Sequence, residues 1–245
     1  MNLLPSHLAA LLCLALPLGA AGADACSARS GPLAVRLVEL YTSEGCSSCP
    51  PADRWLSALK GQPDVVALAF HVSYWDRLGW KDRFASQVFT QRQAEQQRVN
   101  GARYSYTPQV VVDGVDEPRW HARPLPPAHL RAPVQLSLVR EGLAYQAVVT
   151  PESGAPQRLA AYWVLTEGDH RTAVKAGENE GATLGHEFVV RQYQTVAEWT
   201  AAPGQAVTLH FDATTAADAR HPREAALVVI DAASGRPLQA IKLGC

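Results

Sequence analysis

Cys46 and Cys49 are separated by two serines, at a point where a predicted β-strand gives way to a predicted helix. The first cysteine of such a pair lies just ahead of the helix amino terminus, where unpaired amides and the helix dipole favour an anion. This environment lowers the pKa of the thiol, and the thiolate is the species that attacks disulfides. The spacing therefore predicts thiol–disulfide exchange, with Cys46 as the nucleophile and Cys49 as the resolving thiol.

The C-x-x-C pattern is also compatible with other chemistry. A structural zinc ion would need two more ligands at suitable spacing, whereas the other cysteines of the mature chain lie at its ends. A haem attachment would need a histidine after Cys49, where the sequence has Pro50. The pair could form a purely structural disulfide, or it could bind copper together with His71 at the end of the next predicted strand.

Pro108 and Glu39 are further candidates for the same site. Pro108 precedes a predicted strand, and a proline there, opposite a C-x-x-C pair, is predicted to follow a cis peptide bond and to face an extended substrate peptide. Glu39 lies on the strand that leads to Cys46, where a buried carboxylic acid could carry the proton of the dithiol. It could equally be a structural carboxylate paired with an arginine such as Arg54.

The elements that must position these residues are predicted from periodicity and turn signals. They are a strand over 35–41, a helix over 50–60, a strand over 65–72, a helical stretch within 75–101 and a strand over 110–112. A strand, a helix and a strand within about 40 residues form a βαβ unit. The first part of the chain is therefore predicted to be an α/β domain.

The second part of the chain has a different pattern. Five prolines between residues 118 and 133 predict a linker, and we place a domain boundary near residue 131. Six or seven short β segments separated by turn signals then predict an antiparallel β-sandwich over 132–245. The glycine-bounded loop over 177–181 is interpreted as a turn, and His186 is expected to be structural.

Composition excludes several classes of function. The 245 residues include 22 basic and 23 acidic side chains, for a net charge of −1, so the basic face that nucleic-acid binding requires is not expected. The hydrophobic fraction of 47% is sufficient for a proper core. The single methionine is the initiator, which excludes Met-rich copper sites and Met-ligated haem in the mature chain.

Residues 1–23 are predicted to be a signal peptide. Residues 8–18 carry no charge, are too short to span a bilayer as a helix, and are followed by Ala21-Gly22-Ala23, which suits cleavage after Ala23. A buried N-terminal helix is the alternative. No later segment is long and apolar enough to predict a membrane span, and the protein is expected to be periplasmic or secreted.

The mature chain would contain four cysteines, an even number that suits an oxidising compartment. Cys26 and Cys245 lie near its two ends and are expected to pair with each other. Such a bridge would be worth about 5 kcal/mol in the chain-entropy model. Lipid attachment at Cys26 is the alternative, although Asp24-Ala25 lacks the apolar residue that such a cleavage site prefers.

Three segments, VELYTSEGCSSCPPAD, VALAFHVSYWDRLGWKDRF and YTPQVVVDG, resemble an uncharacterised family of secreted, thioredoxin-like bacterial proteins. Together with GENEGATLGHEFVVRQY they span most of residues 35–195. The resemblance implies a thioredoxin-like fold, export, and a C-S-S-C pair on Cys46 and Cys49 with Pro108 as the cis proline. The family itself has no settled activity.

Taken together, the sequence predicts an exported protein with a thioredoxin-like domain over 24–131 and a β-sandwich-like domain over 132–245. The predicted activity is disulfide exchange with a protein or small thiol or disulfide substrate, without a bound cofactor or metal because the dithiol carries the two electrons. The predicted catalytic residues are Cys46, Cys49, Pro108 and Glu39. Two alternatives are a non-enzymatic binding module on a thioredoxin scaffold, and a copper-handling protein that uses both motif cysteines and His71.

Overall fold

The computed structural model describes residues 26–122 and 124–245, so the predicted signal peptide lies outside the described residues. Strands predominate in the described part, together with two α-helices and two short 3-10 turns, and this agrees with the predicted mixture of α and β structure. The helices are α1 (Pro50–Ser57) and α2 (Gln87–Val99). The strands are β1 (Ser27–Arg29), β2 (Arg36–Thr42), β3 (Val65–His71), β4 (Gln109–Val112), β5 (Val115–Asp116), β6 (Val134–Glu141), β7 (Ala144–Pro151), β8 (Arg158–Glu167), β9 (His170–Ala173), β10 (Thr183–His186), β11 (Val189–Thr200), β12 (Val207–Asp212), β13 (Arg223–Asp231) and β14 (Pro237–Leu243).

The predicted strand–helix–strand unit is present as β2, α1 and β3. The two strands pair in parallel, with Leu40 opposite Ala69, and β4 pairs antiparallel with β2 on its other side. Every residue of β3 is buried, as expected for a parallel strand that is covered on both faces. Pro50 and Pro51 occupy the first positions of α1, where no amide donor is missed.

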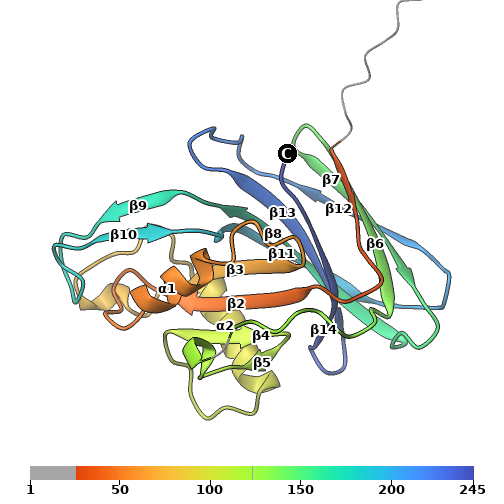
Figure 1. Ribbon diagram of the computed structural model, residues 1–245, viewed down its shortest axis with the longest axis horizontal. Helices are drawn as coiled ribbons and strands as arrows, with labels where there is room; N and C mark the ends of the chain where they lie inside the picture. Colours follow the sequence, from red (N-terminus) through yellow and green to blue (C-terminus); the bar gives the residue numbers. More distant parts are fainter. Residues whose placement is uncertain (1–25, 123) are drawn as a thin grey trace, which may run out of the picture.

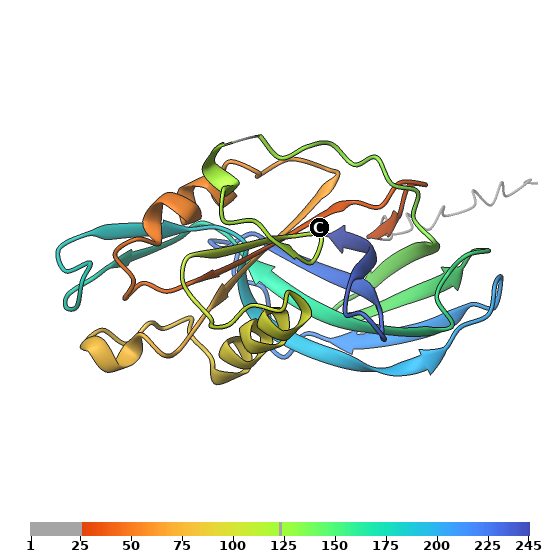
Figure 2. The same ribbon diagram turned by 90° about the horizontal axis from the view of Figure 1, so that it is seen from below.

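The two helices cover opposite faces of this sheet (Figure 2). On one face Leu56 of α1 packs with Val38 and Leu40, and on the other Phe89 of α2 packs edge-on against Phe70 at 5.5 Å between ring centroids. Because successive residues of a strand point to opposite faces, Val38 and Leu40 face α1, whereas Glu39 points toward α2. Glu39 therefore lies on the face of β2 opposite the helix α1 that the C-x-x-C loop leads into.

The sheet continues into the second half of the chain. Its eight strands follow the order β14-β13-β8-β11-β3-β2-β4-β5, and β11 joins β3 in parallel at Val189 and Ala69. A four-stranded sheet in the order β1-β6-β7-β12 packs against the β8–β13–β14 end, with Trp163 stacked on Phe211 in the shared core. Strands from both sides of residue 131 therefore share one sheet, and the boundary proposed there stays a prediction.

The remaining strands, β9 and β10, form a separate hairpin that lies beside α1 (Figure 1). At the other end of the molecule a disulfide joins Cys26 and Cys245, with 6.1 Å between their Cα atoms, which confirms the predicted pairing. The sulfur of Cys26 is engaged in this bond, which argues against its modification by lipid. None of the described helices is long and apolar enough to cross a membrane.

Candidate redox site

Cys46 and Cys49 form a disulfide in the loop between β2 and α1, with 5.4 Å between their Cα atoms. The backbone amide of Cys49 donates to the carbonyl of Cys46, and the amides of Ala52 and Asp53 donate to the carbonyl of Cys49. Cys49 thus stands at the N-cap position of α1, and Cys46 lies one tight turn ahead of it. Both cysteines are fully buried.

Hydroxyl groups surround the sulfur of Cys46. The Thr107 hydroxyl donates to Cys46 Sγ at 3.3 Å, and the Ser48 hydroxyl lies 3.4 Å from the same sulfur. Trp75 Nε1 donates to the Thr107 oxygen at 2.8 Å, so the Thr107 hydroxyl is oriented toward the sulfur. The peptide bond between Thr107 and Pro108 is cis, as predicted. A thiolate on Cys46 would be stabilised by these hydroxyl donors.

Glu39 faces α2 and forms a buried ion pair with Arg92. The Glu39 carboxylate accepts from Arg92 Nη2 at 2.9 Å and Nε at 3.3 Å, and from the Tyr162 hydroxyl at 2.9 Å. The expected arginine partner is therefore present, but it is Arg92 and not Arg54. The catalytic role of Glu39 stays a prediction.

A buried polar cluster lies next to the C-x-x-C loop and contains His71, considered above as a copper ligand, and His186, expected to be structural, together with Asp82 and Glu44, which the sequence analysis did not connect with them. His71 Nδ1 and Asp82 Oδ2 are 2.6 Å apart, and the same Asp82 oxygen accepts from the Glu44 amide at 2.9 Å. His186 Nε2 lies 3.3 Å from Glu44 Oε1, and the His71 and His186 rings are 5.0 Å apart. The described residues contain no group of three or more His, Cys, Asp or Glu side chains arranged to hold a metal ion.

Burial and pairing shift the pKa values in this cluster. Burial alone would raise the pKa of the Asp82 carboxyl, but the charge and hydrogen bond of His71, together with backbone amide donors, lower it to about 2. Burial would lower the pKa of His71, and Asp82 reverses this and raises it. The pair is therefore held as imidazolium and carboxylate.

Asp53 is the carboxylic acid one helical turn after Cys49. It is buried, and this burial raises the pKa of Asp53 despite the opposing influence of His186 and His71. Asp53 and His186 also line a pocket of about 360 Å³ between α1 and the β9–β10 hairpin. The sequence analysis missed Asp53, although its position four residues after Cys49 placed it on the first turns of the predicted helix.

The loop interpreted as a turn lies directly against the cysteine motif. The Asn179 side-chain amide donates to the carbonyl oxygens of Glu44 at 2.9 Å and Cys46 at 3.0 Å. The Glu178 carboxylate accepts from the Ser47 amide at 3.0 Å and the Ser47 hydroxyl at 2.7 Å. These hydrogen bonds lower the pKa of Glu178. The tip of the β9–β10 hairpin is thus part of the candidate site.

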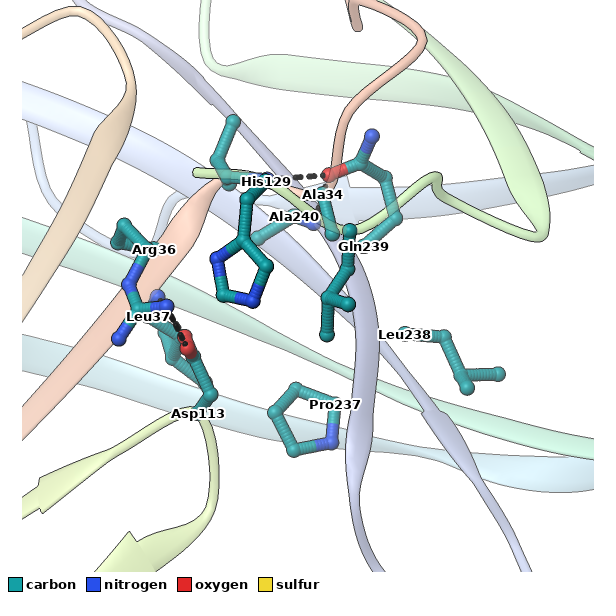
Figure 3. A pocket seen from close by; sticks show the side chains of 11 residues that line it. Ala34, Arg36, Leu37, Asp113, His129, Pro237, Leu238, Gln239 and Ala240 are labelled. Carbon is teal, nitrogen blue, oxygen red and sulfur yellow. Dashed lines mark hydrogen bonds and ion pairs between the residues drawn. The ribbon is translucent and has the colours of Figure 1, made fainter. Parts of the chain in front are cut away.

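Other cavities of the described structure are formed by residues outside the motif. Figure 3 shows a small one, of about 60 Å³, between β2, β14 and the segment that carries His129. Arg36 and Asp113 form an ion pair of 2.8 Å at its wall. A larger cavity of about 440 Å³ adjoins it and is lined by Trp55 and Trp120. Neither is lined by a motif cysteine, and we place the candidate site at the C-x-x-C loop because the disulfide and the hydroxyl groups around Cys46 Sγ lie there.

Comparisons with known proteins agree with this fold. Residues 37–231 match a family model described as "Protein of unknown function (DUF1223)". The crystal structure of protein AGR_C_4864 from Agrobacterium tumefaciens is similar, with a TM-score of 0.65 and 28% identity over 86% of this chain and 94% of that one. HBP35 of Porphyromonas gingivalis has a TM-score of 0.59 and 12% identity over 86% of this chain and 75% of that one, a likeness of fold alone. No curated protein matches the sequence.

Proposed function

The chain belongs to the DUF1223 family of proteins of unknown function, and from that premise we propose that it is an exported thiol–disulfide oxidoreductase acting through Cys46 and Cys49. The observation that carries the proposal is the Cys46–Cys49 disulfide, which lies between a buried strand and the first turn of α1 with hydroxyl donors at the Cys46 sulfur. We assign the protein to the periplasm or the extracellular space because a structural disulfide such as Cys26–Cys245 persists in an oxidising compartment.

We further propose that residues 24–131 form a thioredoxin-like domain and residues 132–245 a β-sandwich-like domain. The parallel β2–α1–β3 unit, the antiparallel β4 and β5, and the cis proline before β4 support the first assignment. The packing of β6, β7 and β12 against β8, β13 and β14 supports the other, although β1, from the first part of the chain, pairs with β6. The shared eight-stranded sheet makes the two parts one structural body.

The exchange reaction starts from the oxidised form. A substrate thiolate attacks Cys46 Sγ, a new sulfur–sulfur bond forms, and Cys49 leaves as a thiolate that takes up a proton. A second substrate thiolate then attacks the substrate sulfur of the mixed disulfide. The substrate leaves as a disulfide, Cys46 leaves as a thiolate, and the protein has gained two electrons as a dithiol. A disulfide substrate would be reduced by the same steps in reverse.

The test uses reduced, unfolded ribonuclease A as the substrate of the oxidised protein. We expect wild type to oxidise its thiols and Cys46→Ser to lose this activity completely. In the reverse direction, Cys49→Ser incubated with a disulfide substrate such as oxidised glutathione should accumulate a mixed disulfide at Cys46, because Cys46 attacks the disulfide and the resolving thiol is absent, and mass spectrometry detects this species. The matched control is the Cys26→Ser/Cys245→Ser double variant, which keeps the motif and should keep the activity. Full activity in Cys46→Ser would contradict the proposal.

The complete burial of both sulfurs favours a second candidate, a binding module whose motif disulfide is structural. Alkylation after mild reduction separates the two functions. A redox-active pair is reduced by dithiothreitol in the folded state and then labelled at Cys46. A structural pair stays unlabelled until the protein unfolds.

A further inference from the structure

The motif disulfide is covered in the structure. A thiolate attacks a disulfide at one sulfur while the other leaves, so it must reach that sulfur directly. Cys46 and Cys49 expose no surface, and no attacking group can reach them in this arrangement. The tip of the β9–β10 hairpin, residues 175–182, lies against the motif and hydrogen-bonds to Ser47 and to the backbone of Cys46 from more than 120 positions along the chain (Figure 1).

The hairpin tip is held to the motif by polar contacts. Glu178 accepts two hydrogen bonds from Ser47, and Asn179 donates to the carbonyl oxygens of Glu44 and Cys46. Four hydrogen bonds therefore connect the Glu178 and Asn179 side chains with the motif and with Glu44, which lies two residues before Cys46.

The same tip contributes little to the core. No residue from 175 through 182 is buried in the described structure, whereas Val174 at its base is. Gly177 and Gly181 have φ angles of +78° and +83°, conformations that glycine adopts without steric cost. Moving the tip away would replace its hydrogen bonds by bonds to water and would uncover part of the half-buried Trp80, against which Gly177 lies.

We propose that the hairpin tip is a removable cap over the Cys46–Cys49 disulfide, and that a polypeptide substrate takes its place. This inference rests on the proposed function. Removal of the cap leaves the Ser47 amide without its acceptor and the Glu44 carbonyl without its Asn179 donor, and it frees one of the two hydrogen bonds of the Cys46 carbonyl, which keeps that from the Cys49 amide. An extended polypeptide offers an N–H and a C=O at every residue and can satisfy these groups together. A small thiol such as glutathione has fewer such groups to replace the contacts of the tip.

The first measurement is access to the disulfide. Oxidised wild type, Glu178→Ala and Asn179→Ala are treated with tris(2-carboxyethyl)phosphine, quenched with an alkylating agent at intervals, and digested for mass spectrometry. We expect each variant to be reduced at Cys46–Cys49 about tenfold faster, the factor that corresponds to about 1.4 kcal/mol of lost hydrogen bonding. Glu180→Ala is the matched control, since this carboxylate is exposed on the same tip and makes no side-chain hydrogen bond within the described residues. The rate at Cys26–Cys245 is an internal reference and should not change.

The second measurement is exchange. Oxidised wild type should react with reduced, unfolded ribonuclease A at least tenfold faster per thiol than with glutathione. Glu178→Ala should lower this ratio of rates, because the glutathione reaction becomes faster. Equal wild-type rates with both substrates would overturn the polypeptide assignment. Unchanged reduction rates in both tip variants, with exchange intact in wild type, would overturn the cap and leave the proposed function standing. Faster reduction without any exchange would establish the cap and overturn the proposed function.

Discussion

Replacing Glu39 by glutamine should destabilise the protein without slowing disulfide exchange in the molecules that stay folded. The Glu39 carboxylate and the Arg92 guanidinium are both nearly fully buried, and Arg92 gives two of its N–H groups to this carboxylate. Glutamine keeps an acceptor for the Tyr162 hydroxyl but leaves the buried guanidinium with only the exposed Glu95 carboxylate, 3.6 Å from Arg92 Nη1, as a counter-charge. Removing one partner of a buried ion pair costs about 3–5 kcal/mol, a large part of the 5–15 kcal/mol that holds a typical domain together.

Urea unfolding followed by tryptophan fluorescence measures this loss. The comparison includes Arg92→Met and the double variant, which should recover part of the stability because the second substitution removes the unpaired charge. Exchange rates are then measured from pH 5 to 9 in the absence of urea. A Glu39→Gln protein within 1 kcal/mol of wild type would refute the argument from the ion pair. If its pH–rate profile moved as well, Glu39 would be a proton carrier for the dithiol, the role predicted from its strand position.

Three further outcomes can be tested. Because His71, against the effect of burial, lowers the pKa of the Asp82 carboxyl from 3.8 to about 2, the pair should contribute about 2 kcal/mol above pH 4 and lose it as the pH falls toward 2. Urea unfolding at several pH values should show this acid limb in wild type and not in Asp82→Asn. The Cys26→Ser/Cys245→Ser double variant should lose about 5 kcal/mol of stability in the same urea unfolding assay, since the bridge closes a loop of 219 residues. An unchanged urea concentration at half unfolding would contradict this prediction. Thr107→Val should raise the pKa of the nucleophilic thiol by about one unit, because the thiolate loses a hydroxyl donor. The pH dependence of alkylation of the reduced protein measures that pKa, and an identical profile would count against a role for the threonine.

Local signals predicted the part of the fold that holds the cysteines. The apolar run over 65–72, interrupted only by His71, favours a strand covered on both faces, and prolines at the start of a helical pattern favour the first helical positions, so β3 and α1 were predicted from their own residues. The cis bond before Pro108 followed from its place before a strand opposite the motif. The strand and helix inferences used residues close together in the chain, whereas the cis proline also required the expected fold to bring it opposite the motif.

The contacts that the sequence did not predict connect distant segments. Nothing near residue 39 indicates that its arginine partner is Arg92, since that choice depends on which face of β2 receives α2. The hydrogen bonds of Glu178 and Asn179 to the motif depend on how β11 joins β3, a pairing between strands about 120 residues apart. Glycines and polar residues in a loop predict a turn equally well whether the turn faces solvent or covers a disulfide.

The same non-local sheet explains how a cap could move while its base stays in place. His186 ends β10 and is buried against Glu44 and His71, and three residues later Val189 pairs with Ala69 in the sheet that carries the motif. The base of the hairpin is therefore fixed to β3 by a buried polar cluster and by strand pairing. The tip has neither: the exposed hydrogen bonds of Glu178, the partly buried ones of Asn179 and the contact of Gly177 with Trp80 hold it to the motif side. Local opening occurs where few apolar contacts must be broken, so the tip can leave the disulfide without separation of β10 from α1 or β11 from β3.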